Sequence, residues 1–595
     1  MSDFIARGLS KSNSNKLEGK VHVKEFGAIG DGSSDDTVAL TNAINHCLKN
    51  SKVLDFGSGT YLFQKSSDWH IISDFTKFIH WTGKGAKIKF STLDIGYMYL
   101  WKMKYVKIDG IAFEGVGAVG NNPNQNAIGV GIYSTYRVSI TGCSFTGFIG
   151  DGLLISAEQS TERNRTAQNI YINNNYFNNN GRGGLTIVGG VVGLVESNYF
   201  GKDRLLVAPV VGDILHIESD PSTRYGVENL EVTNNIIYGT VNLSNVSWQT
   251  GWIGNKDTWI DFNHNTVIVD DDSYSDFGAY GIVSAGGNLR ITENEIEVSR
   301  NTVSDDLGIG ALYLKCNSLI LKRNTIKTSG KGTVISIYNW THNDKGKIIS
   351  KENTYISDTC LYVYRLYKDT SFSNYHKIVK LINEDYASIS SGSWLLSASQ
   401  YGGNSLKYYL EGIRWEFPNG IEFKNPTANH VAYLKNCKIS PSSKLFSWDN
   451  NGTAIKLYSE NCSLTGTVST GILPLPYNLS ATYKFTSGTG THDNTFGTSI
   501  IGRTNTITKT ATGKYQWNAF TKSELYSYSY TLQILLSELE TNVFDISIRL
   551  PSSDNLPVIL EVRNQSNALV DLPDNNYIQV NGKLKSDLAI STLSP

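Results

Sequence analysis

The sequence predicts an all-β fold in which short strands form a stack of coils, with a capping helix at the N-terminal end and a β-sandwich-like domain at the C-terminal end. Three observations predict it. The chain of 595 residues is rich in residues of turns and strands, with 55 Gly, 33 Tyr and 11 Trp. A short pattern recurs about every 30 residues. Segments with a helical period are few, and the chain is too long for one compact core.

The first regular element is a helix expected over residues 35–48, which Ser34 or Asp35 can cap. An open coil exposes apolar interior and free strand edges, so this helix is expected to plug the end of the stack. Its apolar residues recur at helical spacing and share one face: Leu40, Ala43, Ile44, Cys47 and Leu48.

The coils are predicted from a repeat that reads apolar, two residues, Asn, one residue, apolar. Successive matches begin 32, 32, 23, 37, 30, 29, 30 and 29 residues apart, which indicates a solenoid. The Asn is expected to tolerate a left-handed turn and to bond to the Asn of the next coil. Cys143, Cys437 and Cys462 occupy the same slot and are interpreted as buried free thiols. Full matches begin at Ile172, Val195, Val232, Phe262, Ile291 and Leu321; those at Ile108 and Ile140 have the Asn replaced by Ile111 and Cys143, and the last begins with the polar Ser350.

A second strand is predicted in each coil from alternation with a period of two. Its outward side chains would form one continuous face of aromatic and hydroxyl groups, which suits a long polar polymer. The residues of that face are Leu154, Ser156, Thr186, Val188, His216, Glu218, Asn242, Ser244, Tyr313, Lys315, Ser336, Tyr338, Tyr362 and Tyr364. After the coils, Phe544 to Leu550 and Val558 to Val562 alternate strictly, which predicts the β-sandwich-like domain.

Charge and motifs exclude several classes of protein. Lys plus Arg is 53 and Asp plus Glu is 54, so the chain lacks the basic excess of a nucleic-acid or membrane binder. Met1 to Gly19 is polar and unlike a secretory signal, which favours synthesis in a cytoplasm. The six cysteines form no Cys-x-x-Cys, and no zinc-protease or phosphate-binding motif is present. We therefore expect no cofactor, no metal, no nucleic acid and no membrane as partners.

The segment Val23 to Ile44, with the core Phe-Gly-Ala-Ile-Gly-Asp-Gly, resembles the opening signature of the pectate-lyase-like β-helix superfamily. In length and order of elements, the whole chain resembles bacteriophage tailspike proteins that degrade host capsule or lipopolysaccharide. The resemblance implies a right-handed parallel β-helix, a homotrimer, a place in the virion tail and depolymerase activity on capsular polysaccharide at the outer surface of the host cell.

The expected domains follow from the repeat and the resemblance together. Residues 1–20 would be an anchor peptide that attaches to a phage tail adaptor, and residues 21–100 the N-terminal cap. Residues 101–470 would form the β-helix that carries the active site. Residues 471–595 would form a β-rich domain for trimerisation or glycan binding.

Cleavage of a glycosidic bond generally needs two carboxyl groups, one as acid and one as base or nucleophile. The densest candidate is Gly212 to Asp220. Glu218 is expected to be the acid, because partial desolvation raises a carboxyl pKa. Asp220 would stay ionised on the following loop, with His216 and Asp213 on the same strand as Glu218.

Sugar rings have apolar faces that stack on aromatic rings, and acidic sugars pair with arginine. The candidate substrate-binding residues are Trp248, Trp252, Tyr313, Tyr338, Trp340, Arg182 and Arg224. Among other acidic residues, Asp151 is interpreted as part of a structural turn and Asp261 as part of the scaffold. The run from Asp270 to Asp276 is interpreted as a solvated face.

Three functions remain open. A hydrolase is favoured because carboxyl groups cluster at one strand end. A polysaccharide lyase would use Lys315, His216 or Tyr313 to remove the proton beside a uronate carboxylate, but these residues form no cluster in the sequence. The third is a receptor-binding spike without catalysis.

Overall fold

The protein is represented by a computed structural model that divides into two compact units, Met1–Gln400 and Tyr401–Pro595. The residues that it describes are 19–64, 69–91, 98–116, 128–156, 169–189, 192–201, 213–218, 227, 229–244, 259–270, 280–299, 310–329, 332–339, 346–357, 360–368, 378–389, 393–399, 407–417, 419–424, 431–441, 444–448, 455–464, 467–468, 472–476, 478–486, 489–492, 506–511, 514–521, 528–535, 544–549, 557–564 and 577–584. No helix among them is long and apolar enough to cross a membrane.

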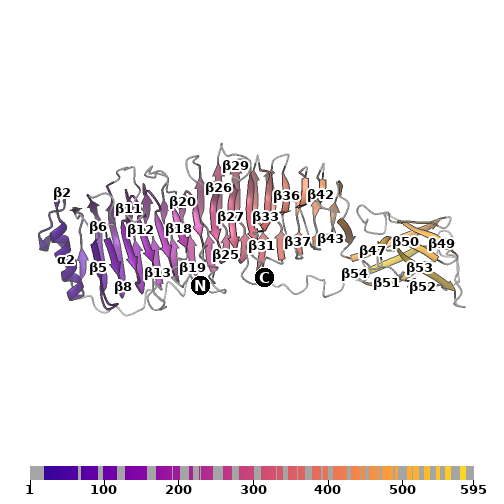
Figure 1. The fold of residues 1–595 in the computed structure, drawn as a ribbon, viewed down its shortest axis with the longest axis horizontal. Coiled ribbons are helices and arrows are strands. Elements are labelled where there is room, and N and C mark those ends of the chain that lie inside the picture. The colour runs from indigo at the N-terminus through magenta and orange to yellow at the C-terminus, as the bar shows by residue number, and fades with distance from the viewer. Residues whose placement is uncertain are drawn as a thin grey trace. The chain divides into compact units, whose positions relative to one another are not determined.

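Helix α2 (Thr37–Asn50) closes the N-terminal end of the first unit, where it contacts the strands β1 (Lys20–His22), β3 (Val53–Asp55) and β6 (Phe78–Phe90) (Figure 1). It begins two residues later than predicted. The reason is Asp36, whose carboxylate accepts hydrogen bonds from the backbone N–H groups of Ile29 and Gly30 at 2.7 and 3.2 Å. The buried Asp36 therefore fixes the glycine-rich turn instead of extending the helix. The cap also contains the 3-10 helix η1 (Val23–Phe26), β2 (Asp31–Asp35) and β4 (Thr60–Phe63).

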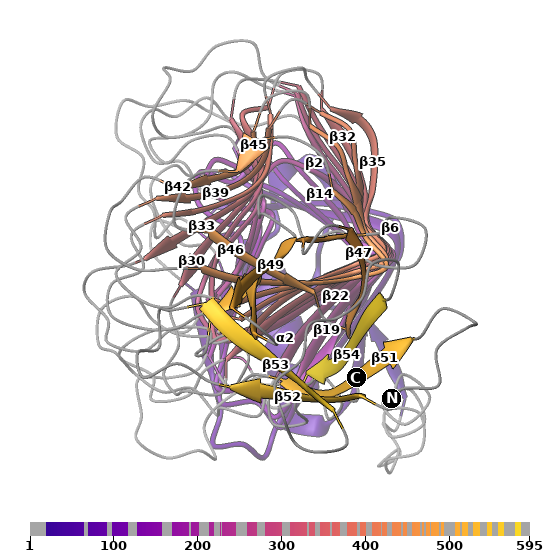
Figure 2. The same cartoon turned by 90° about the vertical axis from the view of Figure 1, so that its right-hand side faces the viewer.

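The rest of the first unit is a right-handed parallel β-helix, which confirms the predicted fold class. Strands of successive coils overlie one another in the end-on view of Figure 2. We call the strands that precede the Asn corner the ladder strands. They are β6, β8 (Tyr105–Glu114), β10 (Arg137–Thr141), β13 (Asn169–Asn173), β16 (Val192–Glu196), β19 (Leu230–Thr233), β22 (Trp259–Asn263), β25 (Asn288–Thr292), β28 (Ser318–Lys322), β31 (Lys347–Lys351) and β34 (Ile378–Ile382).

Short strands follow the corner and pair in parallel in the same way. They are β11 (Ser144–Thr146), β14 (Tyr176–Asn178), β17 (Tyr199–Phe200), β20 (Ile236–Tyr238), β23 (Thr266–Val269), β26 (Glu295–Ser299), β29 (Thr325–Ser329), β32 (Thr354–Ser357) and β35 (Asp385–Ile389).

The third strand of each coil belongs to a separate parallel sheet, which we call the platform sheet. Its strands within the first unit are β5 (Trp69–Ile72), β7 (Met98–Trp101), β9 (Val130–Tyr133), β12 (Leu153–Ser156), β15 (Leu185–Val188), β18 (Leu215–Glu218), β21 (Val241–Leu243), β24 (Tyr280–Ala285), β27 (Gly310–Cys316), β30 (Thr333–Asn339), β33 (Tyr362–Lys368) and β36 (Trp394–Ser399).

The repeat sets the register of the ladder strands. Ile140 pairs with Ile172, Ile172 with Val195 and Val195 with Val232, as the pattern predicts, and the pairing continues to Ser350. The predicted Asn ladder is present at the corner. From Asn175 to Asn353, each side-chain Nδ2 donates to the Oδ1 of the next Asn at 2.8 to 3.2 Å.

Every ladder Asn has further partners. Its Oδ1 also accepts the backbone N–H of the residue in the same slot of the preceding coil, which is Cys143 for Asn175 and an Asn for the others. Its Nδ2 also donates to a backbone carbonyl of the preceding coil. The ladder reaches Glu384, whose carboxylate accepts the Asn353 N–H at 3.0 Å and the Asn353 Nδ2 at 3.3 Å. Burial raises the pKa of Glu384 to about 7.

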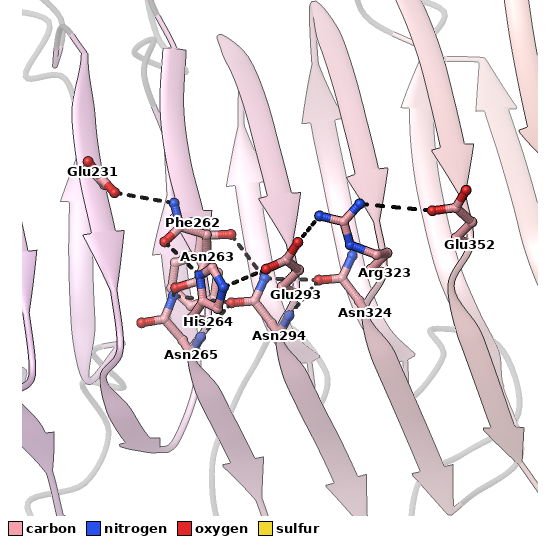
Figure 3. Close-up of polar contacts among 10 residues, drawn as sticks. All are labelled: Glu231, Phe262, Asn263, His264, Asn265, Glu293, Asn294, Arg323, Asn324 and Glu352. Atoms are coloured by element: carbon pink, nitrogen blue, oxygen red, sulfur yellow. Dashed lines mark hydrogen bonds and ion pairs between the residues drawn. The ribbon is translucent and has the colours of Figure 1, made fainter. Parts of the chain in front are cut away.

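The left-handed residue of each corner is not the ladder Asn itself, as the sequence analysis expects, but the residue before it. His264, Glu293, Arg323 and Glu352 have φ values of 54°, 58°, 53° and 59°. Figure 3 shows their side chains beside the ladder: His264 Nε2 is 2.5 Å from Glu293 Oε2, and Arg323 forms ion pairs with Glu293 and Glu352. The ladder Asn is therefore free to point inward, while the preceding residue makes the turn.

The second unit contains further parallel strands. One set is β37 (Lys407–Glu411), β40 (Val431–Lys435), β43 (Ile455–Glu460) and β46 (Ile472–Pro476); a second is β39 (Asn419–Lys424), β42 (Lys444–Trp448) and β45 (Thr467–Val468); a third is β38 (Arg414–Trp415), β41 (Lys438–Ile439) and β44 (Ser463–Leu464). The Cys437 N–H donates to Cys462 Sγ at 3.4 Å, and both thiols are free.

The last strands of the second unit form one eight-stranded antiparallel sheet, in the order β51, β54, β47, β48, β49, β50, β53, β52. The sequence analysis predicts a β-sandwich-like domain here; β52 and β53 coincide with the two alternating segments, and the described strands belong to one sheet. The strands are β47 (Asn478–Thr486), β48 (Thr489–His492), β49 (Thr506–Ala511), β50 (Lys514–Thr521), β51 (Tyr528–Leu535), β52 (Phe544–Arg549), β53 (Pro557–Asn564) and β54 (Tyr577–Leu584).

Candidate functional site

The densest predicted cluster lies on the outer face of the platform sheet. His216 and Glu218 lie on β18, where they pair in register with Thr186 and Val188 of β15. Asp213 stands just before β18. Asp220, Arg224, Trp248, Trp252 and Trp340 lie outside the described residues, as do residues 271–279. Of Tyr338, only the backbone position on β30 is described.

His216 lies between two carboxylates. Its Nδ1 is 3.0 Å from Asp213 Oδ2, and its Nε2 is 2.9 Å from Glu218 Oε2. The second contact is an ion pair between the imidazole and the Glu218 carboxylate. Burial lowers the pKa of His216, but the hydrogen bonds and charges of the two carboxylates outweigh burial and raise it to about 10. The imidazole is therefore a cation at neutral pH.

The expected raised pKa at Glu218 is wrong in direction. Burial does raise it, but the hydrogen bond and charge of His216 and the charge of Arg182 lower the pKa of Glu218 below its ordinary value. Sequence reasoning considered desolvation alone and missed the two cations. Glu218 is therefore ionised at neutral pH and suits the part of a base or nucleophile.

Asp151, which the sequence analysis interprets as structural, is the buried carboxyl of this cluster. Its side chain is fully buried, and neither oxygen has a hydrogen-bond partner among the described residues. The nearest cation is Arg182, with Nε 3.8 Å from Asp151 Oδ1. Burial raises the pKa of Asp151, and the charges of Arg182 and His216 offset only part of that rise. A carboxyl that keeps its proton at this position is suited to general acid catalysis.

Register explains why Asp151 belongs to the site. Leu153, Leu185 and Leu215 pair across three strands, so the residues two positions earlier, Asp151, Gly183 and Asp213, also stand above one another. A Cβ at Gly183 would lie 3.0 Å from Asp151 Oδ1 and 3.0 Å from the Asp213 carbonyl oxygen. The glycine therefore leaves room between the two acids. Alignment of the coils on their platform strands would have revealed this column.

Two more polar residues complete the cluster. Thr186 is buried at 1% exposure, and its Oγ1 has no hydrogen-bond partner among the described residues. Arg182, predicted as a substrate-binding residue, lies beside Asp151, and its charge lowers the pKa of both Asp151 and Glu218. An arginine held there can also contact an acidic or hydroxyl group of a substrate.

The structure does not bring Tyr313 and Lys315 to His216. Tyr313 shares the register column of His216, but β21 and β24 intervene, so the strands are about 14 Å apart at the usual spacing. The predicted outward face is also wrong by one residue on β33. Tyr364 pairs with the inward Ile335 and is buried, while Arg365 pairs with the outward Ser336. A slip of one residue exchanges the faces of a strand.

No group of three or more His, Cys, Asp or Glu side chains suited to hold a metal lies in the described ranges. Asp261, interpreted as a scaffold residue, accepts hydrogen bonds from Arg290 Nη1 at 2.9 and 3.2 Å. The guanidinium of Arg290 lies 4.1 Å from the centre of the Trp259 ring. This ion pair belongs to the ladder strands and is separate from the cluster on the platform sheet.

No family model matches the sequence, and no curated protein matches it. Solved structures that match include a surface adhesin of Streptococcus pneumoniae, PfbA, at 14% identity and a TM-score of 0.37, covering 73% of this chain and 93% of that one. The tailspike of Pseudomonas phage phi297 matches at 9% identity and a TM-score of 0.33, covering 96% and 100%. A tailspike mutant of E. coli bacteriophage HK620, in complex with a pentasaccharide, matches at 10% and 0.37, covering 98% and 100%. At these identities no residue role transfers to this chain.

Proposed function

We propose that the protein is a depolymerase that hydrolyses glycosidic bonds of a bacterial surface polysaccharide on its platform sheet. One observation carries the proposal: Asp151, whose pKa is raised by burial, lies in the same cluster as Glu218, whose pKa is lowered by His216 and Arg182. A pair of carboxyl groups whose pKa values are driven apart is the requirement for glycoside hydrolysis.

In the proposed reaction, Asp151 gives its proton to the glycosidic oxygen as the bond from that oxygen to the anomeric carbon breaks. In one route, Glu218 takes a proton from the water whose oxygen bonds to that carbon. In the other, Glu218 bonds to the carbon; a water that gives a proton to the Asp151 carboxylate then bonds to that carbon as its bond to Glu218 breaks. Both routes need Glu218 ionised, which the adjacent His216 cation favours. Asp213 holds the other ring nitrogen of His216 and so fixes the orientation of the imidazole.

Hydrolysis is preferred to β-elimination for a specific reason. A lyase base must be neutral before it removes a proton, whereas the raised pKa of His216 keeps that side chain protonated at neutral pH. Tyr313 and Lys315, the other candidate bases, lie three strands away. The lyase therefore remains the second candidate, and a binding-only spike the third.

The proposed setting follows the resemblance of the opening signature. The chain would form a homotrimer in a phage tail, made in the host cytoplasm, with residues 1–20 bound to a tail adaptor and capsule as the substrate. Light scattering should then give three times 65.7 kDa. A monomer at micromolar concentration would contradict the trimer.

The test of the chemistry uses Asp151→Asn and Glu218→Gln, with Asp261→Asn as a matched carboxyl control on the ladder strands. New reducing ends are measured on capsular polysaccharide, together with the ultraviolet absorbance of a conjugated uronate. We expect each site variant to lose about a hundredfold or more in rate, and the control to lose little. Absorbance in the product would support the lyase, and an uncut glycan would support the binder. Asp220, still a predicted second carboxyl, is tested in the same way as Asp220→Asn.

A further inference from the structure

Two cysteines occupy the Asn slot in neighbouring coils of the second unit. Cys437 lies between β40 and β41, and Cys462 lies between β43 and β44. The strands on both sides of the corner pair in one register, in which each residue faces the residue 25 positions later, so the two cysteines stand above one another. Neighbouring strands lie about 4.8 Å apart. This spacing is within the range of about 4.4 to 6.8 Å that separates the Cα atoms of a disulfide.

The two thiols form the kinds of hydrogen bond that the ladder Asn residues form in the first unit. The Cys437 N–H donates to Cys462 Sγ at 3.4 Å, as a ladder N–H donates to the next Asn Oδ1. The Cys437 thiol donates to the Leu410 carbonyl oxygen of the preceding coil at 3.3 Å, as a ladder Nδ2 does. Sulfur is a weak acceptor and S–H is a weak donor. This corner is therefore held less strongly than a corner of the Asn ladder.

The two thiols also interact directly, and they differ in exposure and acidity. A hydrogen bond between them lowers the pKa of Cys462 and raises that of Cys437. Cys437 is buried at 2% exposure, whereas Cys462 is partly exposed and lies between the exposed Asn461 and Ser463. The thiolate is the nucleophilic form of cysteine. Cys462 is thus the thiol that reacts with a dissolved oxidant, and Cys437 is placed to react with it afterwards inside the fold.

We propose that Cys437 and Cys462 are a site of reversible oxidation, at which a disulfide joins the coil of β43 and β44 to the coil of β40 and β41. The inference is independent of the proposed hydrolysis. The oxidant is a small-molecule disulfide such as oxidised glutathione.

The reaction takes place in two exchange steps. The Cys462 thiolate bonds to one sulfur of the oxidant as the S–S bond of the oxidant breaks, and one glutathione leaves as a thiolate. Cys437 then gives its proton to solvent, its sulfur bonds to Cys462 Sγ, and the second glutathione leaves. Two protein thiols are oxidised to one disulfide, and one molecule of oxidised glutathione is reduced to two thiols.

The position of the pair indicates what the disulfide does. The two cysteines are 25 residues apart, and closing a loop of this size restricts the unfolded chain and so stabilises the native one. In the reduced protein, N–H···S and S–H···O contacts hold this corner. In the oxidised protein, a covalent bond holds it. Oxidation should therefore slow the local opening of β43 and β44.

Cys143 is the matched control in the first unit. It occupies the same slot, and its thiol also donates to a carbonyl oxygen of the preceding coil, that of Ile108 at 3.6 Å. Its N–H donates to Asn175 Oδ1 at 2.9 Å, so its neighbour in the slot is an amide and not a thiol. Burial raises the pKa of Cys143 to about 12. We expect this thiol to remain reduced under conditions that oxidise the pair.

The test uses the full chain, purified under reducing conditions and equilibrated while folded with glutathione buffers from fully reducing to fully oxidising. Free thiols are then alkylated in denaturant, and the peptides are identified by mass spectrometry. The variants are Cys437→Ser, Cys462→Ser and Cys462→Asn, with Cys143→Ser as the control. Cys462→Asn restores the usual residue of the slot, which keeps the test valid if the serine variants fold poorly. Thermal melting confirms the folding of each protein.

We expect two of the six thiols to become inaccessible to the label as the buffer becomes oxidising, with one cross-linked peptide pair that contains Cys437 and Cys462. The control should form the same cross-link, and both Cys462 variants should form none. Cys437→Ser should stop at a glutathione adduct on Cys462. Backbone hydrogen exchange in β43 should slow by about tenfold or more on oxidation and recover on reduction.

Three outcomes would overturn the site: six labelled thiols in the most oxidising buffer, a glutathione adduct that persists in the unmodified chain, or a cross-link that forms only in denaturant. A cross-link without any change in hydrogen exchange would overturn its effect on the coil. None of these measurements depends on cleavage of a glycan, so their failure and the failure of the proposed hydrolase are distinguishable.

Discussion

Asn265 and Asp151 are both buried on the same β-helix, but the protein treats their polar atoms differently. Asn265 accepts two hydrogen bonds from Asn235 and donates to three acceptors. Asp151 has no hydrogen-bond partner among the described residues, and the same is true of Thr186 Oγ1 and Trp101 Nε1 on the platform sheet. At the corner, the polar side chains form hydrogen bonds within the fold, whereas several buried polar side chains of the platform sheet have no such partner.

An unsatisfied buried polar group costs about 1 to 3 kcal/mol, so three side chains of this kind on one sheet destabilise the fold unless a ligand or water supplies the missing partners. A ligand that supplies the missing partners recovers this free energy when it binds. Mutations can test this comparison. Those in the ladder should lower stability and leave cleavage intact, and those in the carboxyl cluster of the platform sheet should lower the rate of cleavage without lowering stability.

The largest effect on stability is expected at the ladder. Asn294→Ala removes the oxygen that accepts both the backbone N–H and the side-chain amide of Asn265, and the amide that donates to Asn324. The Asn265 backbone N–H then loses its acceptor inside the coil, while the Asn265 side chain keeps its bonds to backbone carbonyls. We expect the free energy of unfolding to fall by about 3 to 5 kcal/mol, measured by urea denaturation, with cleavage by the folded fraction unchanged. Asn263→Ala, in the partly exposed position beside the corner, is the control. Equal losses in both variants would mean that the ladder is not the source of stability.

Glu384 is the one titratable residue among the ladder positions from Asn175 to Glu384, so its protonation makes the stability of the ladder depend on pH. Burial raises the pKa of Glu384 to about 7, from an ordinary 4.5. A carboxyl group whose pKa is raised by folding makes its full contribution to stability below its unfolded pKa. That contribution is lost as pH rises through the folded pKa of about 7. The native protein should therefore lose about 3 kcal/mol between pH 4.5 and 8 relative to Glu384→Gln. Parallel stability curves for the two proteins, measured by urea unfolding at each pH, would refute this.

Asp151→Asn should act in the opposite way to a ladder mutation. Besides the loss of rate, the variant should be more stable than the native protein at pH 7, by about 1 kcal/mol, because an amide needs no proton to remain neutral when buried. The pKa of Asp151 is raised, so the stability of the native protein falls relative to the variant as pH rises through that pKa. A lower free energy of unfolding for the variant at pH 7 would show that Asp151 is a structural residue.

The smallest effect is expected at the outer side of the corner. Arg323 pairs with Glu293 and Glu352, and all three side chains are roughly a third to a half exposed (Figure 3). Arg323→Ala keeps the backbone cost of a left-handed residue and removes only the ion pairs, so we expect a loss below about 1 kcal/mol in urea unfolding. A loss as large as that of Asn294→Ala would place the stability of the corner outside the coil and not in the ladder.

The sequence predicts the coils well because a vertical stack repeats the same contact at every level. The residues that the repeat aligns, such as Ile140, Ile172 and Val195, are the residues that pair between neighbouring strands. The Asn three positions later is therefore aligned as well. The sequence analysis places the left-handed residue one position too late. Asn recurs at the ladder position, whereas the left-handed position before it holds different residues, among them Asn, His, Glu and Arg, so the repeat does not mark it.

The site was predicted less completely. His216, Glu218 and Asp213 are close in sequence and could be found together, but Asp151 comes from two coils earlier and joins them only through register. The direction of the Glu218 pKa depends on His216 and Arg182, and no single strand shows that balance. On β33, a shift of one residue, invisible in a run of alternating aromatic residues, exchanged Tyr364 for Arg365.

The Asn ladder also has an electrical direction. Each side-chain amide from Asn175 to Asn353 donates toward the next coil along the chain, so the amide dipoles point the same way and their fields add, as peptide dipoles do in a helix. The positive end of this row faces the carboxylate of Glu384. The row thus opposes the desolvation of that carboxylate, and it gives the interior of the β-helix a polarity that an apolar core of the same shape would lack.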